Sequence, residues 1–236
     1  MKIITVASLK GGVGKTTLSI FLSLALQNAK KKVLAIDLDH NNNLTDYFLR
    51  DEETDAIQEK SIGRVLKGAL SLPDSIFKTT LGVDIIPSVP ELSQIAFELL
   101  FDTAAPLRFD SMLRNLKYDF IIIDTPPAIS FELSCGLHVA DTVLCPVGYS
   151  RWNIQGYSIL ESKVKRAGGD KLFIGVPSAV TDKRVETLRE GGLSLTKAIV
   201  HKSEAIATAS DSGKPLKEGS SSADEFKILA KEIAKI

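Results

Sequence analysis

A glycine-rich loop near the N-terminus carries the residue types that bind phosphate. Its sequence is Lys10-Gly11-Gly12-Val13-Gly14-Lys15-Thr16-Thr17, and it lies between an apolar run at 2–8 and a helical pattern at 15–29. Glycines let the backbone approach phosphate oxygens, and the N–H groups that open the following helix attract an anion. In such a loop Lys15 reaches the β- and γ-phosphates, and the Thr16 hydroxyl binds Mg²⁺. The loop therefore predicts a site for ATP and magnesium.

Three aspartates at the ends of apolar runs complete the expected site. Asp37 and Asp39 end the run Val33-Leu34-Ala35-Ile36, and Asp124 ends the run Phe120-Ile121-Ile122-Ile123. An acid at the end of a central strand beside a phosphate loop usually holds Mg²⁺ through water, which makes Asp124 the candidate for that task. A lone aspartate in this position is more often a turn residue, but three of them beside one loop favour function.

The loop departs from the general P-loop pattern at one position. Leu9 stands where that pattern has its first glycine, five residues before Gly14. A glycine-rich turn without a ligand is the competing interpretation. The setting between a strand and a helix is the context that a phosphate loop requires, and it disfavours the plain turn.

Short apolar runs alternate with helical patterns along the chain, which predicts an α/β fold. Runs rich in Ile, Val and Leu are typical of strands buried on both faces of a parallel sheet. We therefore expect one domain over 1–236, with a doubly wound, mostly parallel sheet, helices on both faces and a ligand at the carboxyl ends of the strands. The expected strands are 2–8, 33–37, 83–86, 119–124, 142–147 and 171–176, with a weaker one at 197–200. The expected helices are 15–29, 90–101, 107–116, 152–166 and 182–190, and a last one that starts from the capping box Ser222-Ala223-Asp224-Glu225.

Composition excludes several classes of function. Twenty-nine basic residues balance twenty-nine acidic ones, so the whole chain has no net attraction to nucleic acid or membrane. Two cysteines are too few for a zinc site or a disulfide framework. The N-terminus enters a strand pattern without a signal-peptide shape, and no run approaches a membrane span. We expect a cytoplasmic protein that does not bind membranes.

Together these motifs resemble the ParA/MinD family of deviant-Walker ATPases, and they are closer to ParA/Soj-type partition proteins than to MinD. The lysine before the glycines, Lys10, is the signature of that family. Residues 33–45 resemble its second acidic motif, 121–127 its Walker B strand, 142–147 its next core strand, and 212–215 the Gly-Lys-Pro near its C-terminus. The resemblance covers essentially the whole chain.

The resemblance implies a mechanism. Two subunits would form a homodimer around two ATP molecules, with Lys10 of each reaching the partner's phosphates as an arginine finger does. By the same analogy Asp39 orients the attacking water, while Asp37 and Asp124 support the magnesium. Hydrolysis would then separate the dimer, and a centromere-binding or cargo-adaptor protein would stimulate it. The sequence departs from the family after Asp39, where Pro-Gln-Gly is usual and this chain has His40-Asn41-Asn42.

The resemblance also implies nonspecific DNA binding by basic residues late in the chain, and thus association with the nucleoid. Residues 163–217 hold eleven Lys and Arg against six acids, an asymmetry that also fits two ordinary solvated faces. Lys202 stands where the family often has an arginine, and Ala205 replaces a second frequent arginine. The candidate DNA contacts are Lys183, Arg184, Arg189, Lys202 and Lys214.

Four functions remain open from the sequence. The first is an ATPase that partitions plasmid or chromosome DNA, and the second is an ATPase that positions a protein cargo. The third is a small-molecule ligase or phosphotransferase, since related P-loop folds include such enzymes. The fourth is a MinD-like membrane role, which a distinctly basic C-terminal helix would favour and the acids at 224, 225 and 232 disfavour.

Overall fold

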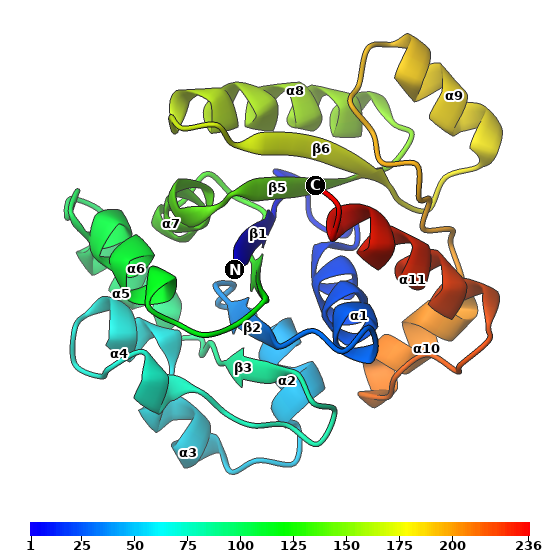
Figure 1. The fold of residues 1–236 in the computed structure, drawn as a ribbon. Coiled ribbons are helices and arrows are strands. Elements are labelled where there is room, and N and C mark those ends of the chain that lie inside the picture. The colour runs from blue at the N-terminus through cyan, green and yellow to red at the C-terminus, as the bar shows by residue number, and fades with distance from the viewer.

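The computed structural model describes residues 1–236 and contains one parallel sheet of six strands (Figure 1). The strand order is β3-β2-β4-β1-β5-β6, and every pairing is parallel. The strands are β1 (Lys2–Val6), β2 (Val33–Asp37), β3 (Asp84–Ile86), β4 (Phe120–Asp124), β5 (Thr142–Val147) and β6 (Leu172–Pro177). The predicted fold class, an α/β doubly wound parallel sheet, is confirmed.

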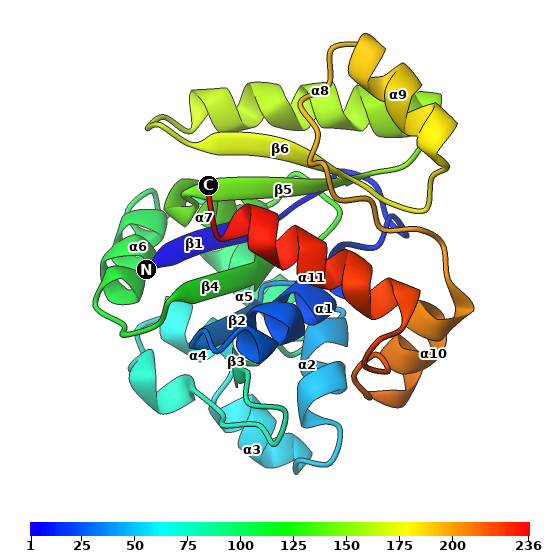
Figure 2. The ribbon, with the colours of Figure 1, turned by 45° about the vertical axis from the view of Figure 1, so that its right-hand side comes forward.

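Helices cover both faces of the sheet because the strand side chains alternate between two apolar clusters. In β4, Phe120 and Ile122 pack on one face, whereas Ile121 and Ile123 pack on the other, as the period of two in a strand requires. The first face is covered by α1 (Lys15–Asn28), α2 (Asn43–Leu49), α10 (Glu204–Ser212) and α11 (Ser221–Ile233) (Figure 2). The second is covered by α4 (Ile62–Leu66), α5 (Leu92–Glu98), α6 (Ala105–Arg114), α7 (Phe131–Val139) and α8 (Arg151–Arg166).

Most predicted elements are present with ends that differ by a few residues, and two predictions were wrong. Residues 197–200 form no strand and make only an isolated bridge from Val200 to Ser178. The last helix is capped by Ser220, whose Oγ accepts a hydrogen bond from the Ala223 N–H. The expected cap, Ser222, instead donates its hydroxyl to Ser203, because Ser220 already satisfies the free N–H of the first turn.

Several short elements were not predicted from the sequence. Besides α2, α4, α7 and α10, they include α3 (Thr54–Glu59) and the 3₁₀ turn Pro73–Ser75. The helix α9 (Asp182–Glu190) was predicted with the observed bounds. Most of the missed helices are shorter than three turns, a length at which packing rather than a sequence pattern decides helicity.

The register of the central strands brings the predicted site together. Val6, Asp37 and Asp124 end β1, β2 and β4 at the same level. We call this side of the sheet the carboxyl edge, and the opposite side, where the strands begin and both chain ends lie, the amino edge (Figure 1). The phosphate loop leaves β1 at the carboxyl edge, so the acids of β2 and β4 lie beside it.

No helix of this fold combines the length and the apolar character that a membrane crossing needs.

Candidate nucleotide site

The phosphate loop has the backbone conformation of an anion cradle. Gly12 and Gly14 have φ angles of 71° and 89°, the left-handed region that glycine enters without steric cost. Gly14 is the N-cap of α1 and supplies no side-chain acceptor. The first N–H groups of α1 therefore remain available to a phosphate group.

Lys15 lies buried beneath this loop. Its Nζ donates to the backbone oxygen of Lys10 at 3.4 Å. Burial lowers the pKa of the Lys15 ammonium, and the negative charges of Asp124 and Asp39 oppose that change. A desolvated ammonium with one weak hydrogen bond is well placed to bind phosphate oxygens.

Asp124 connects the end of β4 to the first turns of α1. Its Oδ2 accepts the Thr16 hydroxyl at 2.7 Å, and its Oδ1 accepts the Ser19 hydroxyl at 2.8 Å. Burial raises the pKa of Asp124 to about 6, although these hydrogen bonds favour the charged form. Ser19 was missed by sequence reasoning, but its spacing of four residues from Lys15 puts it on the same side of α1.

Asp37 ends β2 directly beside Asp124, its partner in the β2–β4 register. The Asp37 Oδ2 accepts the N–H and the hydroxyl of Thr45, at 2.9 Å and 2.8 Å. Burial first, and the charge of Asp124 second, raise the pKa of Asp37 to about 8. Two buried carboxyl groups so close together leave the site in need of a cation.

Asp39 and its neighbours form the loop before α2. The Asp39 Oδ1 accepts both the N–H and the side-chain amide of Asn41, at 3.0 Å and 2.8 Å. Asn42 has a φ of 48°, and asparagine is one of the few residues besides glycine that enters this region readily. Asn42 thus has a conformation that glycine adopts easily, at the position where the Pro-Gln-Gly pattern has its glycine.

The donor set fits magnesium. Thr16, Asp37 and Asp124 offer only oxygen atoms, which Mg²⁺ prefers, and Mg²⁺ normally keeps water and phosphate among its ligands. No group of three or more His, Cys, Asp or Glu side chains is arranged to hold a metal by itself. A magnesium ion here would therefore take most of its ligands from water and nucleotide, and it would neutralise phosphate charge.

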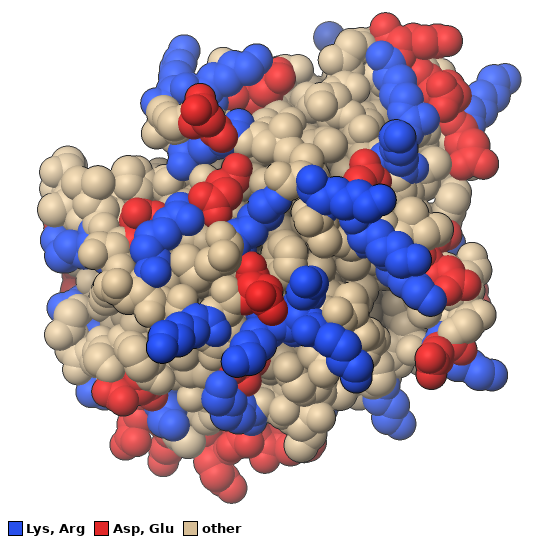
Figure 3. All heavy atoms as spheres, viewed as in Figure 1, with Lys and Arg blue, Asp and Glu red and all other residues tan.

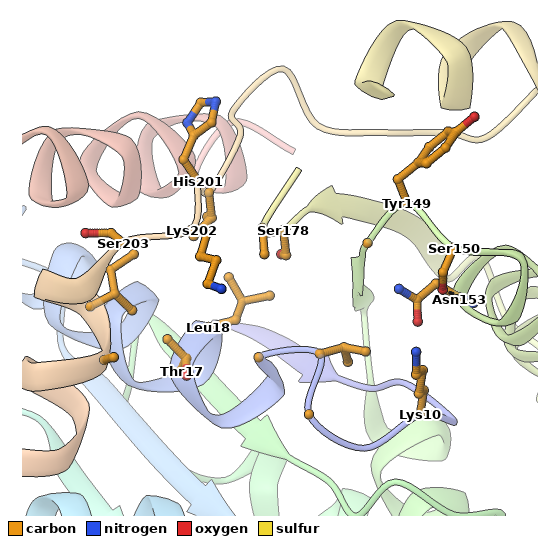
Figure 4. Close-up of a pocket in the computed structure, with 18 of the residues that line it drawn as sticks. Lys10, Thr17, Leu18, Tyr149, Ser150, Asn153, Ser178, His201, Lys202 and Ser203 are labelled. Carbon is orange, nitrogen blue, oxygen red and sulfur yellow. Dashed lines mark hydrogen bonds between the residues drawn. The ribbon is translucent and has the colours of Figure 1, made fainter. Parts of the chain in front are cut away.

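A cavity of about 670 Å³ opens beside the loop and extends to the ends of β5 and β6 (Figure 4). Its lining includes Lys10, Thr17, Asn153 and Ser178, and it is wide enough for a nucleotide. The Asn153 Oδ1 is buried and has no hydrogen-bond partner. In Figure 4 the Lys10 ammonium and the Asn153 amide point toward one another across this cavity. Asn153 and Ser178 were not predicted, because the late loops of the sequence carry no motif.

The predicted DNA contacts differ in their surroundings. Arg184 and Lys202 line the nucleotide cavity, and the Arg184 guanidinium lies over the Tyr149 ring at 5.2 Å. Arg189 is paired with Glu186 at 2.7 Å and donates to the backbone oxygen of Thr196. Lys183 and Lys214 are exposed and make no ion pair. Two of the five residues therefore face a nucleotide-sized cavity.

Known proteins resemble this chain in sequence and in fold. Residues 1–171 match the family model described as an AAA domain. The sporulation initiation inhibitor protein Soj of Bacillus subtilis (strain 168) is 30% identical over 251 residues, which cover 99% of this chain and 98% of Soj. A structure described as a plasmid partition protein of Borrelia burgdorferi B31 bound to AMPPNP has a TM-score of 0.86 and 25% identity, and the match covers 100% of this chain and 99% of that one.

The same fold also occurs in a biosynthetic enzyme. Cobyrinic acid a,c-diamide synthase from Mycobacterium smegmatis, with bound ADP and magnesium, has a TM-score of 0.81 and 21% identity. That match covers 100% of this chain and 94% of the synthase. An identity at this level shows a shared fold and leaves the reaction to be argued from the site.

Proposed function

The chain belongs to the ParA/MinD-type P-loop ATPases, and from this premise we propose that it is an ATP-driven dimerisation switch in DNA partitioning. ATP with Mg²⁺ binds in the cavity beside the phosphate loop, and two subunits join with their loops facing one another. Hydrolysis separates the subunits. The main observation behind the proposal is that the Asp124 carboxylate accepts hydrogen bonds from Thr16 and Ser19, directly after a phosphate loop that begins with Lys10.

In this proposal each site residue has a defined task. Lys15 and the N–H groups at the start of α1 bind the phosphates of the same subunit. Thr16 holds the magnesium, while Asp124 and Asp37 support it from the ends of their strands. Asp39 orients the attacking water. Lys10 is exposed and makes no ion pair within its own subunit, so its ammonium is free to contact the phosphates of a partner subunit.

Exposed apolar side chains support the dimer. Phe101, Ile129 and Trp152 are 86%, 63% and 70% exposed. Ile129 follows β4 and Trp152 follows β5, so both lie at the carboxyl edge. Phe101 precedes α6. Because the end of α6 leads to the amino end of β4, the start of α6 lies at the carboxyl edge, and Phe101 lies there with it. Large exposed apolar groups around one site favour an interface, and here the interface would close over the nucleotide.

We infer that the dimer binds DNA without sequence preference, and that a centromere-binding protein stimulates hydrolysis. Positioning of a protein cargo by the same DNA-based cycle is the second candidate, and these two functions differ in the partner alone. On either function the protein works in the cytoplasm, where it associates with the nucleoid.

A ligase is the weaker candidate. A ligase needs a second substrate pocket beside the phosphates. A second cavity, about 780 Å³, lies between α4 and α6 and shares no lining residue with the nucleotide cavity. ATP turnover that rises with a small metabolite, and with neither DNA nor a protein partner, would favour the ligase.

The test is a DNA mobility shift with the Asp39→Ala variant in ATP, in ADP and without nucleotide. We expect this variant to bind ATP, to remain dimeric because hydrolysis is blocked, and to shift plasmid-length DNA most strongly in ATP. A variant that binds ATP and still remains monomeric would overturn the switch. Dimerisation without any DNA shift would retain the switch and remove DNA as its target.

A further inference from the structure

Six lysines gather at the amino edge of the sheet, on the side away from the nucleotide cavity. All six are exposed, and none takes part in an ion pair. We call them the amino-edge lysines: Lys30, Lys31, Lys32, Lys117, Lys231 and Lys235. Figure 3 views this face and shows basic side chains gathered across its middle, with fewer acidic ones between them.

The topology of the fold explains why these lysines meet. In a parallel sheet with helical crossovers, the helices on the faces end where the next strands begin. Lys30–Lys32 join the end of α1 to β2, and Lys117 joins the end of α6 to β4. The Lys32 backbone N–H donates to the Asp119 carboxylate at 2.8 Å, which ties the two junctions together. Lys231 lies in the last turn of α11 and Lys235 follows the end of this helix, which packs along α1.

Three acidic groups of this edge are already engaged, whereas the exposed Asp170 before β6 makes no ion pair. Asp141 is paired with Arg114 at 2.9 Å, and Asp119 accepts the Lys32 N–H. Glu232 accepts the backbone N–H groups of Lys197 and Ala198 at 2.9–3.0 Å. The positive charge of the amino-edge lysines is therefore not neutralised by ion pairs within the chain.

Lysines at helix ends also favour the helix dipole, which is the ordinary explanation for such residues. The helix dipole does not account for Lys30. Its φ is 63°, a left-handed position that follows a helix end and is usually taken by glycine. A lysine there carries a conformational cost that glycine would avoid, although Lys31 and Lys32 already supply the charge that one helix end attracts.

We propose that the amino edge binds the sugar–phosphate backbone of DNA, separately from the late-chain basic residues. Lysine ammonium groups bind phosphates as point charges, and contacts of this kind carry no sequence information. This face has no exposed aromatic side chain of the kind found at the carboxyl edge, so it offers no anchor for the interface of a membrane. The inference deepens the DNA-binding part of the proposed function.

The location has a consequence for the dimer. If two subunits join at their carboxyl edges, their amino edges face outward, each about 17 Å of strand length from its nucleotide site. One dimer then presents two separate DNA-binding faces. A short duplex reaches one face only and should bind equally well in ATP and ADP. A long DNA reaches both faces and should bind the ATP dimer more tightly because binding becomes bivalent.

The test compares the triple variant Lys30→Gln/Lys31→Gln/Lys32→Gln with a control, Arg64→Gln/Lys217→Gln, which removes two exposed charges that make no ion pair and are not among the predicted DNA contacts. Fluorescence anisotropy measures the binding of a duplex of about 20 base pairs between about 50 and 300 mM salt. We expect the triple variant to bind at least about tenfold more weakly at low salt, with a salt slope smaller by about 3. The control should resemble the wild-type protein, and ATP binding should be equal in all three.

Four outcomes would overturn this inference. They are an unchanged salt slope in the triple variant, a loss confined to the control, no duplex binding by the wild-type protein at about 50 mM salt, and binding to vesicles of anionic lipid in place of DNA. The failure of the proposed switch is measured separately, by ATP turnover and dimerisation. A protein that binds DNA through these lysines without dimerising in ATP would disprove the switch and support the amino-edge surface.

Discussion

At the carboxyl edge of the sheet the aspartates at the strand ends are buried and bound to partners, whereas at the amino edge six lysines are exposed and unpaired. Asp37 and Asp124 are 0% and 1% exposed, and each accepts at least two hydrogen bonds. Lys31 and Lys117 are exposed and make no ion pair. The difference follows from the ligands each edge can take, since a small nucleotide needs a preorganised site and a long polyanion needs only a charged face.

This contrast predicts how substitutions act at each edge. A change at the carboxyl edge removes a group that the fold has already desolvated, so ligand binding falls steeply. A change at the amino edge removes one of several similar charges in high dielectric, so each single effect is small and sensitive to salt.

The largest effect is expected at Lys15. Lys15→Ala removes the buried ammonium that faces the phosphates, and loss of a buried charged partner costs about 2–5 kcal/mol. ATP affinity should fall at least about 100-fold when measured by isothermal titration calorimetry with Mg²⁺. Lys31→Ala is the matched control and should bind ATP as the wild-type protein does. Equal losses of ATP affinity in the two variants would contradict the proposed difference between the two edges.

The second effect concerns the exposed apolar side chains around the nucleotide site. Trp152→Ala should weaken the ATP-bound dimer by about 2 kcal/mol, or roughly 30-fold, because large aromatic groups dominate interfaces. Light scattering on size-exclusion peaks, with AMPPNP and Mg²⁺, measures the monomer–dimer equilibrium. Ile228→Ala, on the 55% exposed Ile228 of α11, is the control and should dimerise normally. A dimer that depends on Ile228 and not on Trp152 would place the interface elsewhere.

The third effect separates charge from backbone strain at Lys30. Lys30→Gly relieves a left-handed residue and should raise the free energy of unfolding by about 1 kcal/mol, which corresponds to about 2–4 °C in Tm. Lys30→Ala loses the same charge, keeps the strain and should not gain stability. Thermal unfolding and DNA anisotropy on both variants give the two quantities separately. The proposed role of Lys30 requires both variants to weaken DNA binding equally.

The sequence predicted the carboxyl edge far better than the amino edge. Gly12, Lys15 and Asp124 are recognisable because one motif dictates their types and spacing, and Asp37 ends an apolar run that could only be a buried strand. The amino-edge lysines belong to junctions that are about 85 residues or more apart along the chain. Only the strand order, which no local pattern specifies, brings them to one face.

The late part of the chain was the least predictable for a related reason. Residues 197–200 have the apolar, β-branched composition of a strand, yet they meet the end of β6 only through one isolated bridge, from Val200 to Ser178. The N-cap of α11 is Ser220, two residues before the predicted Ser222. Three serines in a row are equally suitable as caps, and the hydrogen bond from Ser222 to Ser203 leaves this task to Ser220. Tertiary contacts therefore decide the positions of Arg184 and Lys202 at the nucleotide cavity.

The smallest effect tests whether paired charge at the carboxyl edge contributes stability. His201 lines the nucleotide cavity, and its Nδ1 lies 2.7 Å from Glu225 and its Nε2 3.4 Å from Asp182. The hydrogen bond to Glu225 is the main cause that raises the pKa of His201 above its usual value. A histidine raised in this way contributes stability that is complete below its unfolded pKa of about 6.5 and is lost as pH rises through its folded pKa.

His201→Gln should therefore be less stable than the wild-type protein near pH 6, and the gap should close by about pH 9. Because the His201 side chain is 44% exposed, solvent screening limits the gap to less than about 1 kcal/mol. Urea unfolding at several pH values measures it, and Glu225→Gln is the matched control, since without that partner the pH-dependent part should mostly disappear. A gap that persists unchanged to pH 9 would mean that His201 contributes by packing, and that ion pairing at this edge adds nothing measurable to stability.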